Sequence, residues 1–245
     1  MGWAQGRVRG LAMGNEMNGS SPHQTAQAAR VWYVLLTAFS VFGILVADAR
    51  FYVPGDAAAT VARILAEEGL YRLGIASVLA GQACQIFLGL VLYRLFKPVN
   101  KDRARTLLAL VIAMVPIAFL NMLNKFVPLI LMGNSAFAQA FDPSQLQALS
   151  MLSLELQKVG TLVAGVFWGL WLIPLGLLVL KSGYFPRILG VLLLVACAGY
   201  LADSFVAFTL PAFSGTIAPI AHALAALGEM PFALWMIFRG AKDPA

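Results

Sequence analysis

The amino-acid sequence predicts an all-α fold: a polytopic membrane helix bundle with six transmembrane helices and short interfacial helices in its outer loops. The first observation is composition, because 60% of the residues are hydrophobic, 11% are charged and the mean hydropathy is +0.82. In a soluble domain about 25% of the residues are charged, so the composition indicates a membrane protein. The second observation is a series of six segments that approach or reach the roughly 20 apolar residues that a spanning helix needs.

The polar stretch at the start of the chain, residues 1–29, lacks the apolar core of a signal peptide. We expect it to be a disordered cytoplasmic tail, and Met13 and Met17 are candidate translation starts beside Met1. Residues 30–240 form the predicted six-helix transmembrane domain. Residues 241–245 are expected to be a short cytoplasmic tail.

The six apolar segments follow one another along this domain. They are Val31–Ala47, Tyr71–Phe96, Thr106–Met132, Val159–Leu180, Ile188–Leu210 and Thr216–Phe238. The third, fourth and sixth contain Pro116, Pro174 and Pro231, respectively. Proline removes a backbone N–H donor, so each of these helices is expected to be kinked.

Two loops on the outer side contain helix patterns of their own. In "VPGDAAATVARILAEEGL", Asp56 stands where a helix N-cap is expected, and an apolar stripe predicts a short helix at the membrane interface. In "FDPSQLQALSMLSLELQK", Asp142 followed by Pro143 marks a helix start, and leucines recur at helical spacing. This second helix is expected to lead almost directly into the fourth span.

The basic residues predict how the bundle is oriented, because Lys and Arg near helix ends are retained on the cytoplasmic side. One set of ends carries 12 of the 17 basic residues: Arg7, Arg9, Arg30, Arg94, Lys97, Lys101, Arg103, Arg105, Lys181, Arg187, Arg239 and Lys242. We therefore expect both termini to be cytoplasmic, in a multi-pass protein of the cell inner (plasma) membrane.

Several classes of partner are disfavoured by the same composition. The net charge is +6, but the basic residues are scattered between apolar segments and form no stripe that would bind nucleic acid. Cys84 and Cys197 lie within apolar runs, which favours small buried side chains over a disulfide or metal site. With His23 and His222 as its two histidines, the sequence indicates neither a metal site nor a cofactor.

Four blocks of sequence occur in the order "VPGDAAATVARILAEEGLYRLGI", "LYRLFKPVNK", "FDPSQLQALSMLSLELQ" and "GYFPRILGVLLLVACAGYLADSF". In this combination the chain resembles a bacterial integral-membrane family catalogued as domain of unknown function 4386. The similarity extends from about Arg30 to Gly240. It implies a six-span membrane fold, and it carries no activity, ligand or site residue across to this chain.

Polar side chains recur at matching depths in four of the predicted helices. Asp203 follows Ile188 by 15 residues, and Asn121 follows Thr106 by the same number, so each lies roughly 22 Å into a core of about 30 Å. We therefore predict a polar, outward-opening cavity. Its candidate residues for ligand binding or charge relay are Asp203, Glu229, His222, Lys125, Asn121, Gln82 and, at the rim, Arg72.

The alternative role for these residues is to hold the helices together through interhelical hydrogen bonds. We favour that role for Asn121 and Gln82. For Asp203 and Glu229 we favour a functional role, since a carboxylate costs about 2.5–3.5 kcal/mol to insert and neutral residues would join the helices at a lower cost. His222 is open to both interpretations, and the ammonium of Lys125 could instead extend outward to water.

Two further interpretations concern neighbouring side chains. Asp203 is expected to point into the bundle and to form an ion pair with Lys125 or Arg72, Lys125 being preferred, with Asn121 or Tyr200 adding a hydrogen bond. The aromatic segment "VFWGLWLIP", which contains Trp168, is interpreted as packing surface, with the wall of a ligand site as its alternative.

These observations favour a protein that binds a small solute in the polar cavity or transports it, by itself or linked to protons. The protein is expected to lie in the lipid bilayer, and a homodimer is one possible arrangement. The alternative is a non-catalytic membrane accessory, sensor or scaffold subunit. An enzyme is disfavoured because no nucleophile or zinc motif is present. A hydrolytic pair of Asp203 and Glu229 is also disfavoured, because the two are expected at different levels.

Overall fold

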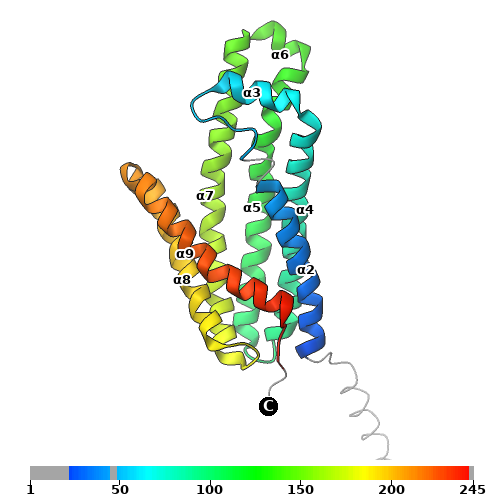
Figure 1. Ribbon diagram of the computed structural model, residues 1–245, viewed down its shortest axis with the longest axis vertical. Helices are drawn as coiled ribbons and strands as arrows, with labels where there is room; N and C mark the ends of the chain where they lie inside the picture. Colours follow the sequence, from blue (N-terminus) through cyan, green and yellow to red (C-terminus); the bar gives the residue numbers. More distant parts are fainter. Residues whose placement is uncertain (1–21, 45–48, 243–245) are drawn as a thin grey trace, which may run out of the picture.

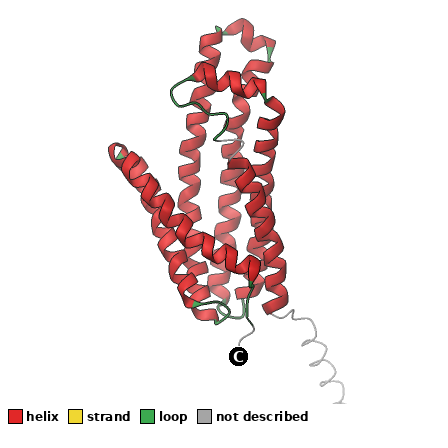
Figure 2. Ribbon diagram, viewed as in Figure 1, coloured by secondary structure: helices red, strands yellow, loops and turns green. Residues whose placement is uncertain are grey.

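The computed structural model describes residues 22–44 and 49–242, and these form eight helices and no strand (Figures 1 and 2). The helices are α2 (Pro22–Gly43), α3 (Ala57–Ala66), α4 (Glu68–Phe96), α5 (Lys101–Gly133), α6 (Ser135–Ala140), α7 (Pro143–Ser182), α8 (Arg187–Thr209) and α9 (Pro211–Phe238). The expected tail is described only from residue 22 on, where it already belongs to α2. Residues 1–21 and the tail at 243–245 lie outside the described ranges.

Three long helices, α4, α5 and α7, run side by side along the length of the molecule (Figure 1). Helix α2 packs along α4, while α8 packs on α7 and α9 packs on α8. The α8–α9 hairpin leans away from α7 towards its tip (Figure 1). The start of α2 and the end of α9 lie at the same end of the bundle, which we call the terminal end; α3 and α6 lie at the opposite, distal end.

Within the described ranges, five helices are long and apolar enough to cross a membrane: α4, α5, α7, α8 and α9. The described part of α2 does not reach the same hydropathy, because it begins with the polar sequence "PHQTAQAAR". The fold is therefore a multi-pass helical membrane bundle, and the sixth span stays a prediction. Helices α5, α7 and α9 continue through Pro116, Pro174 and Pro231 without ending.

The helix starts in the distal loops are where the sequence predicts them. Asp56 caps α3, since its side chain accepts a hydrogen bond from the Ala59 N–H at 2.8 Å. At the start of α7, the Asp142 N–H donates to Gln145 Oε1 at 3.0 Å. Helix α7 then runs unbroken into the apolar segment, as predicted, and its 40 residues extend for about 60 Å, twice the thickness of a bilayer core.

Glycine allows α7 and α8 to cross at close range. A Cβ at Gly190 would lie 2.8 Å from the Gly176 carbonyl oxygen, and a Cβ at Gly176 would lie 2.9 Å from the Gly190 carbonyl oxygen. Helices in a membrane associate through such small residues, because the surrounding lipid leaves little hydrophobic driving force between helices. This crossing is near the terminal end, so it anchors the hairpin there while the hairpin tip stands away from the bundle.

The buried apolar residues form two separate cores, one towards each end of the bundle. The larger core is at the terminal end and includes Leu88, Leu107 and Leu172. The smaller core lies beneath α3 and includes Ile64 and Tyr71. The predicted polar residues other than Arg72 line cavities in the middle part of the bundle.

Candidate functional site

Two adjoining cavities lie between the two cores. The distal cavity, of about 440 Å³, is bounded by α3, α4, α5, α7, α8, α9 and the loop before α3. The central cavity, of about 560 Å³, is bounded by α2, α4, α5, α7, α8 and α9. Five residues line both cavities: Lys125, Gln157, Thr161, Trp168 and Tyr200. Both volumes are in the range of small-molecule sites.

Asp203 and His222 are in hydrogen-bonding contact at one end of the distal cavity. His222 Nε2 lies 3.1 Å from Asp203 Oδ2; the Asp203 side chain is mostly buried, and the His222 side chain is exposed. The neighbouring Ser204 hydroxyl donates to the Leu162 carbonyl at 2.9 Å, which fastens this part of α8 to α7. Asp203 therefore points into the bundle, as expected, and faces a cavity.

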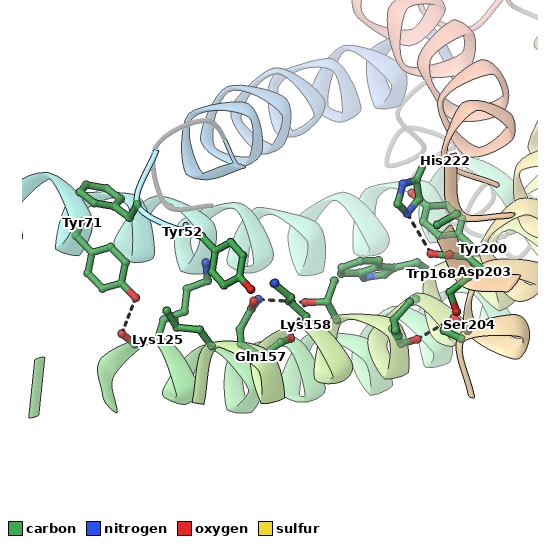
Figure 3. A pocket seen from close by; sticks show the side chains of 18 of the residues that line it. Tyr52, Tyr71, Lys125, Gln157, Lys158, Trp168, Tyr200, Asp203, Ser204 and His222 are labelled. Atoms are coloured by element: carbon green, nitrogen blue, oxygen red, sulfur yellow. Dashed lines mark hydrogen bonds and ion pairs between the residues drawn. The ribbon is translucent and has the colours of Figure 1, made fainter. Parts of the chain in front are cut away.

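The expected ion pair between Asp203 and Lys125 does not form. Lys125 lies beside Tyr71 at the other end of the distal cavity, and the Tyr71 hydroxyl donates to the Lys125 carbonyl at 2.9 Å (Figure 3). Although the two residues are at similar depths by residue counting, they lie at opposite ends of the cavity (Figure 3), and Asp203 contacts His222 of α9 instead. The expected hydrogen bond to Asp203 from Asn121 or Tyr200 is also absent, because both donate elsewhere.

Glu229 belongs to the central cavity. Its carboxylate accepts a hydrogen bond from the Tyr200 hydroxyl at 2.7 Å. Tyr200 and Asp203 are three residues apart on α8, and His222 and Glu229 are seven apart on α9, so both pairs form along one face of the α8–α9 contact. One pair faces the distal cavity and the other faces the central cavity.

The side-chain amides of Asn121 and Gln82 both line the central cavity, but they differ in their hydrogen bonds. Asn121 joins α5 to α7, since its amide donates to the Gln157 carbonyl at 2.9 Å and to Thr161 Oγ1 at 3.2 Å. This contact agrees with the structural role favoured for Asn121. Gln82 on α4 has a buried Oε1 that accepts no hydrogen bond from the described residues.

Arg72, expected at the cavity rim, lines neither cavity. Its Nε lies 2.7 Å from Glu68 Oε1 in an exposed ion pair one helical turn away. Its neighbour Tyr71 faces the distal cavity instead. The reason is rotational, because consecutive residues of a helix point about 100° apart and a depth estimate contains no rotation.

The sequence interpretation missed a group of polar and aromatic residues in the distal cavity. Lys158 Nζ lies 3.4 Å from the centre of the Tyr52 ring and 3.1 Å from Glu155 Oε1. The Tyr52 hydroxyl also bonds to Glu155. Trp168 lines both cavities, so the alternative interpretation of the aromatic segment, as a cavity wall, describes its position. Aromatic residues deep within an apolar segment were the available signal.

No cluster of three or more His, Cys, Asp and Glu side chains suited to a metal ion occurs in the described part of the chain. The lining is mainly apolar and aromatic, with a few amide, hydroxyl and charged groups placed among these side chains. Such a site can bind a small molecule through its apolar body and orient it through a small number of polar contacts.

Apolar helices of spanning length, joined by short loops around two cavities, define a multi-pass helical membrane protein. Residues 29–240 match the family described as domain of unknown function, DUF4386, and the chain belongs to that family. This finding confirms the resemblance drawn from the sequence.

The chain is similar to part of an archaeal protein. An uncharacterized protein of Archaeoglobus fulgidus is 39% identical over 77 residues, which are 31% of this chain and 44% of that protein. The match thus covers less than half the length of that relative. No solved structure is significantly similar to the chain.

Proposed function

We propose that the protein binds a small solute in the two cavities and couples its binding or transport to proton transfer. The observation that carries this proposal is the pair of contacts on the α8–α9 wall, Asp203 with His222 in the distal cavity and Tyr200 with Glu229 in the central cavity. Ionisable groups inside a membrane are costly and usually mark a pathway for ions, protons or substrates. Two such groups on one wall supply proton acceptors at two levels of a single path.

The residues that line both cavities support a continuous binding region. Trp168 and Tyr200 offer aromatic surface to both spaces, and Gln157 and Thr161 add hydrogen-bonding groups at the same level. A solute that moves between the cavities would pass these side chains. Aromatic faces with a few polar groups favour an organic solute over a bare inorganic ion.

For orientation, we propose a bacterial inner membrane with the terminal end of the bundle in the cytoplasm. The basic residues at that end support it. Reporter fusions test it: a fusion at Gly183 or Ala241 is expected to report the cytoplasm, and a fusion at Asn134 the outside. An external signal at Ala241 would overturn the proposed orientation.

Native mass spectrometry of the purified full chain tests binding. We expect a bound small molecule on the wild-type protein and its loss from Trp168→Ala, which opens both cavities. The matched control is Phe205→Ala on α8, because Phe205 is exposed and lines neither cavity. A wild-type protein that holds nothing except detergent and bilayer phospholipid would contradict solute binding and favour the accessory or scaffold role.

Coupling to protons is tested in liposomes that contain a pH-sensitive dye and the purified protein. Addition of the solute identified by mass spectrometry is expected to change the internal pH with wild-type protein. Glu229→Gln keeps the size and the hydrogen bond from Tyr200 but cannot release a proton, so the pH change should be lost while solute binding persists. An unchanged pH response in Glu229→Gln would contradict the role of this carboxyl.

A further inference from the structure

The central cavity offers hydrogen-bond acceptors that the described residues leave unfilled. Glu229 lines this cavity, and the Tyr200 hydroxyl donates to Glu229 Oε2 at 2.7 Å, with no second donor among the described residues. An ionised carboxylate has about four acceptor positions, so Glu229 can accept further hydrogen bonds. Gln82 Oε1 is buried and accepts none from the described residues. A ligand that fits these two groups is a hydrogen-bond donor.

Two pairs of aromatic rings adjoin Glu229 and line the same cavity. Tyr200, which donates to Glu229, packs edge to face on Trp168 with the ring centres 6.2 Å apart. Phe232 follows Glu229 by three residues on α9 and so shares its helix face. The Phe232 ring packs edge to face on Tyr33 at 6.0 Å. Aromatic faces attract cations, and they do so more strongly away from water, so these rings and the carboxylate favour a positively charged group.

The second charged group of the central cavity stands apart from this carboxylate. Among the described residues that line the cavity, Glu229 and Lys125 are charged. Figure 3 shows Lys125 and Tyr200 well apart along the bundle, with Trp168 between them. Because Tyr200 is hydrogen-bonded to Glu229, the negative charge lies at the end of this region that is remote from Lys125. The local charge at Glu229 therefore favours a cationic ligand.

An apolar rim between α2 and α9 opens the central cavity to lipid. Four residues line the cavity and are nevertheless about half exposed: Val41 (50%), Ile44 (56%), Met230 (58%) and Leu234 (48%). Met230 follows Glu229 directly in α9, so the rim reaches the level of the carboxylate. In a bilayer such an apolar rim faces hydrocarbon. A ligand that enters between these two helices therefore needs an apolar body.

We propose that the ligand of the central cavity is a lipophilic amine in its ammonium form, which enters from the bilayer between α2 and α9. Its ammonium group binds at the Glu229 carboxylate beside the aromatic rings, and its apolar body fills the cavity. The inference rests on the proposed function that the cavities bind a solute, and it specifies the class of that solute and its route of entry.

Dodecylamine, dodecanol and dodecanoate are suitable probes, because they share one chain and have a positive, a neutral and a negative head, respectively, at neutral pH. Native mass spectrometry of the full chain in detergent is expected to show one dodecylamine per protein, held about tenfold more tightly than either of the other two. Binding of dodecanoate or dodecanol as tight as that of dodecylamine would overturn the inference.

Glu229→Gln tests the head group, because it removes the negative charge and keeps the size of the side chain. Binding should persist through the chain and the rings, but dodecylamine should bind about tenfold more weakly than to the wild type and no more tightly than dodecanol. A thermal unfolding scan establishes that the variant is folded. Glu68→Gln is the matched control, because Glu68 lines neither cavity and forms an exposed ion pair with Arg72. An unchanged preference for the amine in Glu229→Gln would refute binding at this carboxylate.

Ala233→Phe tests the position of the chain, because it places a ring in the central cavity and should weaken dodecylamine binding about tenfold. Ala226→Phe is the matched control on the same helix, because Ala226 is exposed and lines neither cavity. Equal binding by both variants and the wild type would overturn the inference, since the amine would then lie on the outer surface of the bundle. If the wild type binds no dodecylamine but retains a water-soluble molecule, this inference fails while the proposed function stands.

Discussion

Replacing Gly228 with alanine is expected to destabilise the protein, because the α8 backbone lies very close to α9 there. A Cβ at Gly228 would lie 2.3 Å from the Leu192 carbonyl oxygen and 2.4 Å from the Ala196 Cβ. Ordinary contacts are 3.4–4 Å, so the two helices would have to separate by about 1 Å. Two of the three nearest atoms belong to the α8 backbone, which cannot rotate away as a flexible side chain can.

Two opposing effects determine the size of the change. Overpacking a well-packed interior costs about 1–3 kcal/mol, and the backbone contacts at Gly228 favour the upper end of that range. Alanine is also a better helix former than glycine, by about 1 kcal/mol in water. The expected net loss in the free energy of unfolding is therefore about 2 kcal/mol. The same separation would lengthen the neighbouring Tyr200–Glu229 hydrogen bond.

A thiol-reactive fluorescent dye can measure this change, because Cys84 and Cys197 are buried and become accessible only as the bundle opens. The midpoint of dye labelling during heating should fall by several degrees in Gly228→Ala. Gly215→Ala is the control on the same helix, where an added Cβ meets no atom within 4 Å, and its midpoint should stay constant or rise. A midpoint in Gly228→Ala at or above that of the wild type would refute the close-packing argument.

Two further predictions concern interhelical hydrogen bonds. Tyr200→Phe removes the hydroxyl that donates to Glu229, so it should lower the free energy of unfolding by about 1–3 kcal/mol. The same dye assay measures this change. An unchanged labelling midpoint would show that the hydrogen bond contributes nothing to stability. Asn121→Ala removes the bonds from α5 to α7 and should cost about 0.6–1.7 kcal/mol. Asn124→Ala should have almost no effect, because among the described residues Asn124 donates only to Asn121, in its own helix. Equal losses in both variants would contradict the assignment of the stability to the α5–α7 contact.

Much of the local structure was predictable because it depends on neighbours in the sequence. Asp56 and Asp142 mark helix starts through contacts within three residues of each. The spanning helices α4, α5, α7, α8 and α9 follow from runs of apolar residues alone. The weakest prediction of this kind was the first span, where polar residues precede the apolar run and the helix begins at Pro22.

The candidate site was predictable only in part. Counting residues along a helix estimates depth, and it predicted a single cavity for these residues. The structure divides them: Asp203 and His222 line the distal cavity, Gln82, Asn121 and Glu229 line the central cavity, and Lys125 lines both. Residue counting could not identify Gln157 or Thr161, because a polar residue at the outer end of a long helix is ordinary in sequence. Gln157 and Thr161 line both cavities because α7 is long enough to run alongside the two of them.

By itself, the sequence determined the class of protein, the positions of the helices and the presence of carboxylates within apolar segments, because each of these depends on composition or on contacts along one helix. The tertiary structure alone decided which groups meet. Asp203 pairs with His222 and not with Lys125, and Tyr71 rather than Arg72 faces the cavity. The physical reason is that a partner depends on the rotation and tilt of each helix. Both are set by packing between helices, here by the glycine crossing of α7 with α8 and the lean of the α8–α9 hairpin.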